Sequence, residues 1–142
     1  MADRNAVDIA LRALRSRDRT VAELEARLSE RGVNAEERDD AIETLARAGY
    51  LDDRRVAHAR AASLAERGSG DALIRADLVQ RGLEPELVEE ALETLEAEGA
   101  RAERIVAHRG QGPKTVRYLA SRGFAGETLE GIVARDAGQA IG

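Results

Sequence analysis

The sequence contains no cysteine and no tryptophan, and it has few of the residues that build a thick core. Without cysteine there is no disulfide framework, no thiolate nucleophile and no cysteine-ligated zinc site, which fits a reducing compartment. Only three of the 142 residues are aromatic, and 27 of the apolar residues are alanine, so large apolar side chains are scarce. We therefore expect a small domain or an array of small units, and not a single globule with a thick core.

Long apolar runs are missing as well. No run approaches the roughly 18 residues that a membrane span needs. Residues 1–4, Met-Ala-Asp-Arg, lack the basic-then-apolar order of a secretory signal. We therefore expect a cytoplasmic protein with no membrane contact.

Lysine is almost absent: Lys114 is the single lysine, and the other 21 basic residues are arginines. Acidic residues outnumber basic ones, which gives a net charge of -5. This total argues against a surface that coats DNA uniformly. The charge is unevenly distributed: residues 1–50 carry a net -2, residues 51–98 a net -6 and residues 99–142 a net +3. The last third of the chain is therefore the candidate for binding an anionic partner.

Patterns typical of catalysis are not found. His58 and His108 lie 50 residues apart at equivalent places of an internal repeat, so we do not expect them to share a metal or a catalytic triad. Asp52 and Asp53 suit helix capping better than metal binding, because adjacent residues diverge by about 100° on a helix. The sequence has no phosphate loop and no nucleotide fingerprint. We expect no enzymatic activity, no metal and no cofactor.

The strongest signal is an internal repeat. When the sequence is shifted by 50 residues, 22–49 aligns with 72–99, and 11 of the 28 positions are identical. A third, more diverged copy follows at an offset of 41, where residues 119–124 repeat the Arg-Gly-apolar turn. The chain is thus a tandem array, with predicted repeats at 1–50, 51–98 and 99–142.

Each repeat has the pattern of three helices. Apolar residues recur at spacings of three and four, strand-like alternation is missing, and Ala, Leu, Arg and Glu favour helix. Capping signals mark several helix starts, such as Thr20 with Glu23, and Pro85 and Pro113 at first helical positions. The predicted helices lie near 6–16, 20–31, 35–48, 53–67, 71–81, 85–98, 100–109, 113–122 and 126–136. The fold class is therefore all-α, an array of three three-helix units whose body is elongated and can curve.

Gly32, Gly82 and Gly123 are predicted to be structural turns. Each follows the last helical residues, and an apolar residue comes after it. With the glycine in the left-handed conformation, that apolar residue contacts a leucine inside the preceding helix and closes a Schellman end.

Arginine and lysine residues form the candidate partner-binding surface. In the last unit basic residues recur at near-helical spacing close to Tyr118, and basic residues with an aromatic neighbour suit phosphates or an acidic protein groove. A solvated basic helix face would have the same pattern. The predicted partner-binding residues are Arg54, Arg55, Arg60, Arg101, Arg104, Arg109, Lys114 and Arg117.

Several segments together resemble the RecX family of regulatory proteins. The most specific ones are Gly-Tyr-Leu-Asp-Asp at residues 49–53 and Arg-Gly-Phe at 122–124, and the likeness covers about residues 6–134. The resemblance implies a non-enzymatic protein that binds the RecA recombinase filament on single-stranded DNA and mainly inhibits its strand exchange and ATP hydrolysis. The acidic total favours contacts to the recombinase itself, with weak or no independent DNA binding. We expect the chain to be a monomer.

Two alternatives stay open at this point. Residues 20–51 also resemble the two helices of a winged-helix DNA-binding protein, although residues 52–67 lack the alternation of a wing. The other alternative is a generic helical scaffold for an unrelated protein.

Overall fold

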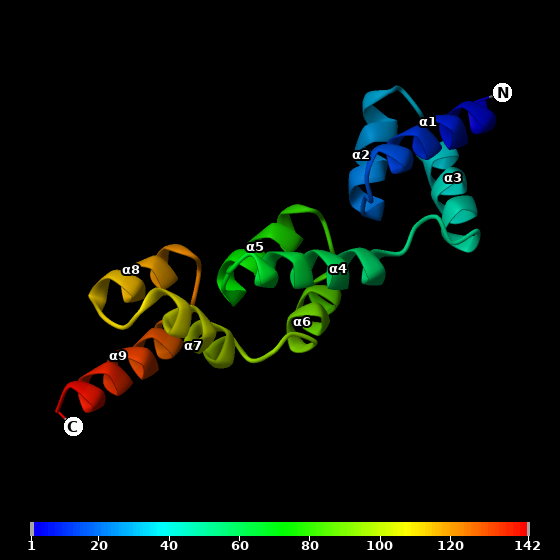
Figure 1. Cartoon of the computed structure of the whole chain (residues 1–142). Helices are drawn as coiled ribbons and strands as arrows, with labels where there is room; N and C mark the ends of the chain where they lie inside the picture. The colour runs from blue at the N-terminus through cyan, green and yellow to red at the C-terminus, as the bar shows by residue number, and fades with distance from the viewer. Residues whose placement is uncertain (1, 142) are drawn as a thin grey trace.

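The computed structural model describes residues 2–141, with side chains described for residues 5–138. Within this part of the chain all regular structure is helical, as predicted. The helices are α1 (Ala2–Ser16), α2 (Val21–Glu30), α3 (Ala35–Arg47), α4 (Asp53–Glu66), α5 (Asp71–Gln80), α6 (Pro85–Glu93), α7 (Glu98–Arg109), α8 (Pro113–Ser121) and α9 (Gly126–Ile141). They follow one another along an elongated body, with α1 and α9 at opposite ends (Figure 1).

The helices pack in three groups of three, which we name unit one (α1–α3), unit two (α4–α6) and unit three (α7–α9) (Figure 1). Each unit buries its own apolar cluster, and unit three has the fewest buried members. The principal buried side chains are Leu24 and Leu28 in unit one, Ile74 and Leu78 in unit two, and Leu119 and Phe124 in unit three. The predicted array of three three-helix units is confirmed, and it explains how a chain with few large apolar residues folds.

The second helix of each unit ends in the same turn. Gly32, Gly82 and Gly123 have φ angles of +83°, +81° and +85°. The next residue donates its N–H to a leucine carbonyl inside the helix, for example Val33 N to Leu28 O at 3.0 Å. These are the bonds of a Schellman end, and they make glycine the suitable residue because side chains disfavour positive φ.

Helix starts follow the capping signals of the sequence. Thr20 and Glu23 form a complete capping box at α2. Asp52 caps α4, since its Oδ1 accepts the N–H of Arg55 at 3.1 Å. The helix that begins at Asp53 also occupies the segment where a winged-helix protein would place its hairpin, so the structure does not support that alternative.

The end of α6 differs from the prediction. The sequence pattern indicates a helix over 85–98, whereas α6 ends at Glu93 and α7 begins at Glu98. The Thr94 hydroxyl donates to Ala91 O at 2.6 Å, which satisfies a carbonyl of the last helical turn. The turn that follows brings α7 back onto unit two, so tertiary contacts outweigh the local helix propensity of residues 94–97.

Units one and two meet where the Arg81-Gly82 turn packs on the start of α2; we call this contact joint one. Thr20 Oγ1 donates to Arg81 O at 2.6 Å. The Arg81 guanidinium pairs with Glu23 at 3.0 Å. A Cβ added to Gly82 would lie 2.4 Å from Ala22 Cβ, so this glycine is needed for the close approach as well as for its φ.

Units two and three meet in the same way at joint two, where the Arg122-Gly123 turn packs on the start of α5. Gly70 N donates to Arg122 O at 2.7 Å, and Ala72 N donates to Gly123 O at 3.1 Å. A Cβ on Gly70 would lie 2.5 Å from backbone atoms of Gly123 and Phe124. The two joints therefore repeat one contact. In each, the Schellman turn of one unit packs on the start of the second helix of the unit before it.

A carboxylate completes each joint. In joint one, the first residue of α4, Asp53, accepts the N–H of Val21 at the start of α2 at 2.9 Å. In joint two, the first residue of α7, Glu98, accepts the N–H of Asp71 at the start of α5 at 2.7 Å. Burial raises the pKa of Asp53. Burial also opposes the ionisation of Glu98, but hydrogen bonds from the Thr128 hydroxyl and from backbone amides outweigh it and lower its pKa. These side chains cap a helix across a unit boundary.

Candidate partner-binding site

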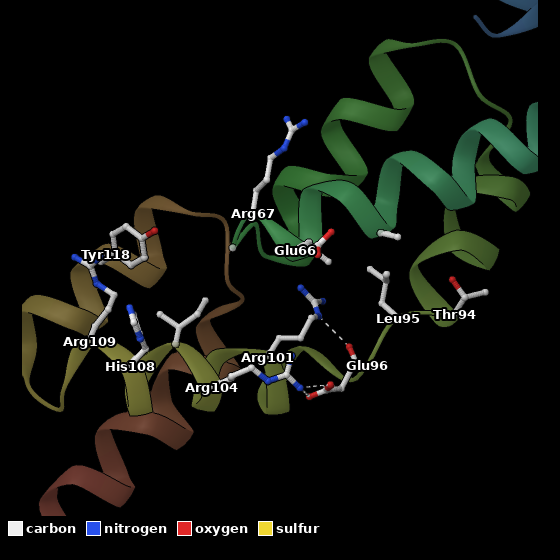
Figure 2. Close-up of a pocket in the computed structure, with 14 residues that line it drawn as sticks. Glu66, Arg67, Thr94, Leu95, Glu96, Arg101, Arg104, His108, Arg109 and Tyr118 are labelled. Atoms are coloured by element: carbon white, nitrogen blue, oxygen red, sulfur yellow. Dashed lines mark hydrogen bonds and ion pairs between the residues drawn. The ribbon is translucent and has the colours of Figure 1, made fainter. Parts of the chain in front are cut away.

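A cavity of about 770 Å³ lies between units two and three. Its apolar lining includes Ala62 and Ala65 of α4, Leu95 and Ile105, and the ring of Tyr118 stands at one end (Figure 2). Four arginines and two glutamates also line it. The cavity thus combines an apolar interior with a rim of net positive charge, a combination that suits a protein segment carrying both apolar and acidic side chains.

Arg109 and Tyr118 form the aromatic part of this site. The Arg109 guanidinium lies 3.7 Å from the centroid of the Tyr118 ring, within the range of a cation–π contact. Both side chains border the cavity, and His108 lies beside them on α7 (Figure 2). The ring holds the guanidinium in place, which reduces the conformational entropy that binding a carboxylate or phosphate would cost.

Arg101 and Arg104 are one turn apart on α7 but have different environments. Arg101 is only 7% exposed, and its guanidinium donates to Ser69 O and Glu96 O, both at 2.9 Å, and to the Asp71 carboxylate. Arg104 is exposed and pairs with the Glu96 carboxylate (Figure 2). Arg101 therefore joins units two and three, whereas Arg104 remains accessible at the cavity rim.

The predicted arginines of unit two lie away from the cavity. Arg54 and His58 both contact Glu90 Oε2, at 2.8 and 2.9 Å, and these hydrogen bonds lower the pKa of that carboxyl. Arg60 pairs with Asp77 through two bonds of 2.9 Å, which lowers the pKa of Asp77. All four of these contacts connect helices within unit two, so they contribute to its packing.

Arg55 lies near joint one. Its guanidinium is 3.8 Å from Asp18 Oδ1, and both side chains are about half exposed or more. An ion pair of this length in solvent is weak. Arg55 is therefore free to exchange Asp18 for another anion.

Within the described part of the chain, Lys114 and Arg117 have no ion pair, like Arg109, and unlike Arg109 they also lack an aromatic partner. Both are exposed on α8. Arg117 also borders a second hollow of about 550 Å³ between α8 and α9, together with Val116 and Val133. Their charges are available to a partner without the loss of an internal contact.

The structure thus gathers Arg101, Arg104 and Arg109 at one cavity and places the other predicted residues elsewhere. It adds Glu66, Arg67 and Leu95, which the sequence pattern did not indicate. Arg67 follows the last residue of α4 as its C-cap, and its side chain extends away from the other labelled groups (Figure 2). No sequence signal could have found these residues, because they reach the cavity only through the packing of unit three on unit two.

Metal-binding and membrane-spanning features are not found in the described part of the chain. Among residues with described side chains, no three His, Asp or Glu groups cluster closely enough to hold a metal ion. Of the helices that the structure describes, none is long and apolar enough to cross a membrane.

The fold and the site define a tandem helical-repeat protein with an open, charged hollow between two of its units.

Two family models match the chain. The model described as RecX, first three-helix domain, matches residues 6–45, and the model described as RecX, second three-helix domain, matches residues 52–92. Together they cover more than half of the sequence. The chain belongs to the RecX family of regulatory proteins.

Individual proteins agree with this assignment. The regulatory protein RecX of Trichlorobacter lovleyi is 43% identical over 60 residues, which are 42% of this chain and 39% of the relative. The match thus spans about two fifths of that relative's length.

The crystal structure of RecX from Lactobacillus salivarius has a TM-score of 0.80 at 17% identity, covering 96% of this chain and 97% of that one. Another crystal structure of regulatory protein RecX has a TM-score of 0.75 at 19% identity, covering 94% and 72%. At these identities the two structures show the shared fold.

Proposed function

We propose that this chain binds the filament of a RecA-type recombinase on single-stranded DNA and mainly inhibits its strand exchange and ATP hydrolysis. Membership of the RecX family carries the proposal. The elongated array supports it, because three units in a row present several small surfaces to the repeated protomers of a filament (Figure 1). Weak contacts made at the same time by linked units add up to tight binding.

Charge distribution favours contact with the recombinase over independent contact with DNA. The whole chain is acidic at -5, while residues 99–142 carry seven basic and four acidic side chains. Three of the four arginines that line the cavity, and the exposed cations of α8, belong to unit three. We propose that unit three forms the main contact and that residues of units one and two make secondary contacts.

A titration of DNA-dependent ATP hydrolysis tests the proposal. The cognate recombinase is assembled on single-stranded DNA, and the chain is added at ratios from well below one per protomer up to equimolar. We expect suppression at substoichiometric amounts, because blocking filament extension affects many protomers at once. An unrelated acidic helical-repeat protein is the control. Unchanged hydrolysis at the equimolar ratio contradicts the proposal, and a pull-down would then test the generic scaffold.

The double substitution Lys114→Glu and Arg117→Glu is expected to weaken inhibition about tenfold. Both side chains are exposed and free of ion pairs, so charge reversal should leave the fold intact. The measurement is the concentration for half-maximal inhibition, with helicity followed by circular dichroism. Arg12→Glu with Arg15→Glu in α1 is the matched control, since it makes the same change of charge at exposed positions of unit one. Equal inhibition by both variants would place the main contact outside α8.

A further inference from the structure

We propose that the Arg31-Gly32-Val33 turn of unit one is a docking site for the N-terminal turn of a helix from a partner protein. The equivalent turns of units two and three each hold such a helix start within the chain, at joints one and two. The turn of unit one has the same conformation, and no helix start from the described part of the chain packs on it. The inference goes beyond the proposed function, because it defines a separate surface and the local chemistry that fits it.

Joint one shows what this kind of turn accepts. The helix that it receives starts with a hydroxyl that donates to the turn carbonyl, Thr20 Oγ1 to Arg81 O. A small residue, Ala22, lies against the turn glycine. An acid in the first helical turn, Glu23, pairs with the turn arginine. Three features of the helix start are thus recognised at once.

Joint two repeats the first two features with different residues. Gly70 supplies the donor to Arg122 O through its own N–H. The start of α5 is again small, with Gly70 and Ala72 facing the turn, so backbone approaches backbone closely. The recurrence with different side chains shows that the turn selects a helix start with an N–H or hydroxyl donor and small first residues.

The turn of unit one is preformed and open. Its backbone bonds match those of the other two turns: Gly32 N donates to Ser29 O at 3.0 Å and Val33 N to Leu28 O at 3.0 Å. A Cβ on Gly32 would meet no atom within 4 Å, in contrast to the equivalent glycines of both joints. Arg31 is exposed and has no ion pair with any side chain that the structure describes, whereas Arg81 pairs with Glu23. The site therefore needs no rearrangement before a helix start binds.

The second helices of another copy of this chain do not supply the helix start. The starts of α2 and α5 are already occupied in joints one and two. The start of α8 is closed, because Gly112 N donates to Asp136 Oδ2 at 3.1 Å and Pro113 has no N–H to donate. Asp136 thus takes the place that the Arg122 carbonyl has in joint two, because Gly112 and Gly70 are the equivalent N-cap residues of α8 and α5. The occupant that we assign to the turn of unit one is therefore a helix of a different protein, with small residues and an acid in its first turn.

The first experiment uses the recombinase filament as the probe and in this respect rests on the proposed function. Arg31→Glu is expected to raise the concentration for half-maximal ATPase inhibition about tenfold, because it replaces the pairing charge by a repelling one. Arg47→Glu is the matched control: it makes the same change on an exposed arginine, at the far end of α3 and about 18 Å from its start. If the original chain inhibits and Arg31→Glu inhibits equally well, the docking site is refuted while the proposed function stands.

The second experiment needs no recombinase. The probe is a synthetic peptide of residues 18–30, held helical by a side-chain cross-link on its exposed face, which carries the helix start that joint one receives. Titrated into the labelled full chain, it is expected to shift the amide resonances of residues 31–34, and Gly32→Asn should remove these shifts. Asparagine tolerates positive φ but places a side chain where the helix would lie. Shifts that spread over the chain, or that persist in Gly32→Asn, overturn the proposal even if the filament is not inhibited.

Discussion

Replacing Gly70 with alanine is expected to lower the free energy of unfolding by about 2–3 kcal/mol. The local backbone does not require glycine here, because its φ of -82° suits any residue. The cost comes from joint two, where the new Cβ would lie 2.5 Å from three backbone atoms of residues 123–124. Backbone cannot rotate away as a side chain can, so unit three must move and weaken the bonds from Gly70 N and Ala72 N.

Gly131→Ala provides the matched control for that substitution. Gly131 lies inside α9, and a Cβ there would meet no atom within 4 Å. Alanine is the better helix former, so this change should stabilise the protein by about 0.5–1 kcal/mol. Urea unfolding followed by circular dichroism measures both effects, and hydrogen exchange localises them. An unchanged unfolding curve for Gly70→Ala would mean that joint two is not packed as described.

Arg101→Ala is expected to lower the free energy of unfolding by about 3 kcal/mol. The Arg101 side chain is 8% exposed and connects Ser69 O, Glu96 O and the Asp71 carboxylate. Its guanidinium also lies 6.0 Å from the centroid of the Phe124 ring. Truncation leaves the buried Ser69 carbonyl without its donor, and this unsatisfied group costs free energy in addition to the lost pairing with Asp71.

Arg104→Ala is the control on the same helix. Arg104 is exposed, and its pairing with Glu96 is a surface ion pair, so its loss should cost less than about 1 kcal/mol. The two variants are compared by thermal and urea unfolding at equal pH and salt. Equal destabilisation would refute the role of Arg101 in holding units two and three together. A much larger effect of Arg101→Ala would support that role and count against Arg101 as a partner-binding residue.

Local features of the structure could be predicted because they depend on residues close together in sequence. The Schellman turn needs a glycine after a helix and an apolar residue next to it, and all three turns have both. Asp52 precedes a helical pattern and caps it. The repeat of 50 residues showed that such features recur, and from there the number of helices and units followed.

The end of α6 could not be predicted from local sequence. Residues 94–97 have good helix formers, yet the chain turns there, because Glu98 and Arg101 have to reach the start of α5. The same limit applies to Arg101. It was predicted to face a partner because its spacing with Arg104 and Arg109 is that of residues on one helix surface. Spacing along one helix does not tell which side a neighbouring unit will cover.

The all-α class, the array of three units and several helix caps can be predicted from the sequence, because propensity, capping and turn chemistry act over a few residues. The tertiary structure decided how the units join, which arginine is buried between them, and that Gly70 and Gly82 are needed for close approach. Those properties depend on residues about 30 to 60 positions apart being brought into contact. For the same reason only the folded chain shows that the turn at Gly32 is open while the start of α8 is closed by Asp136.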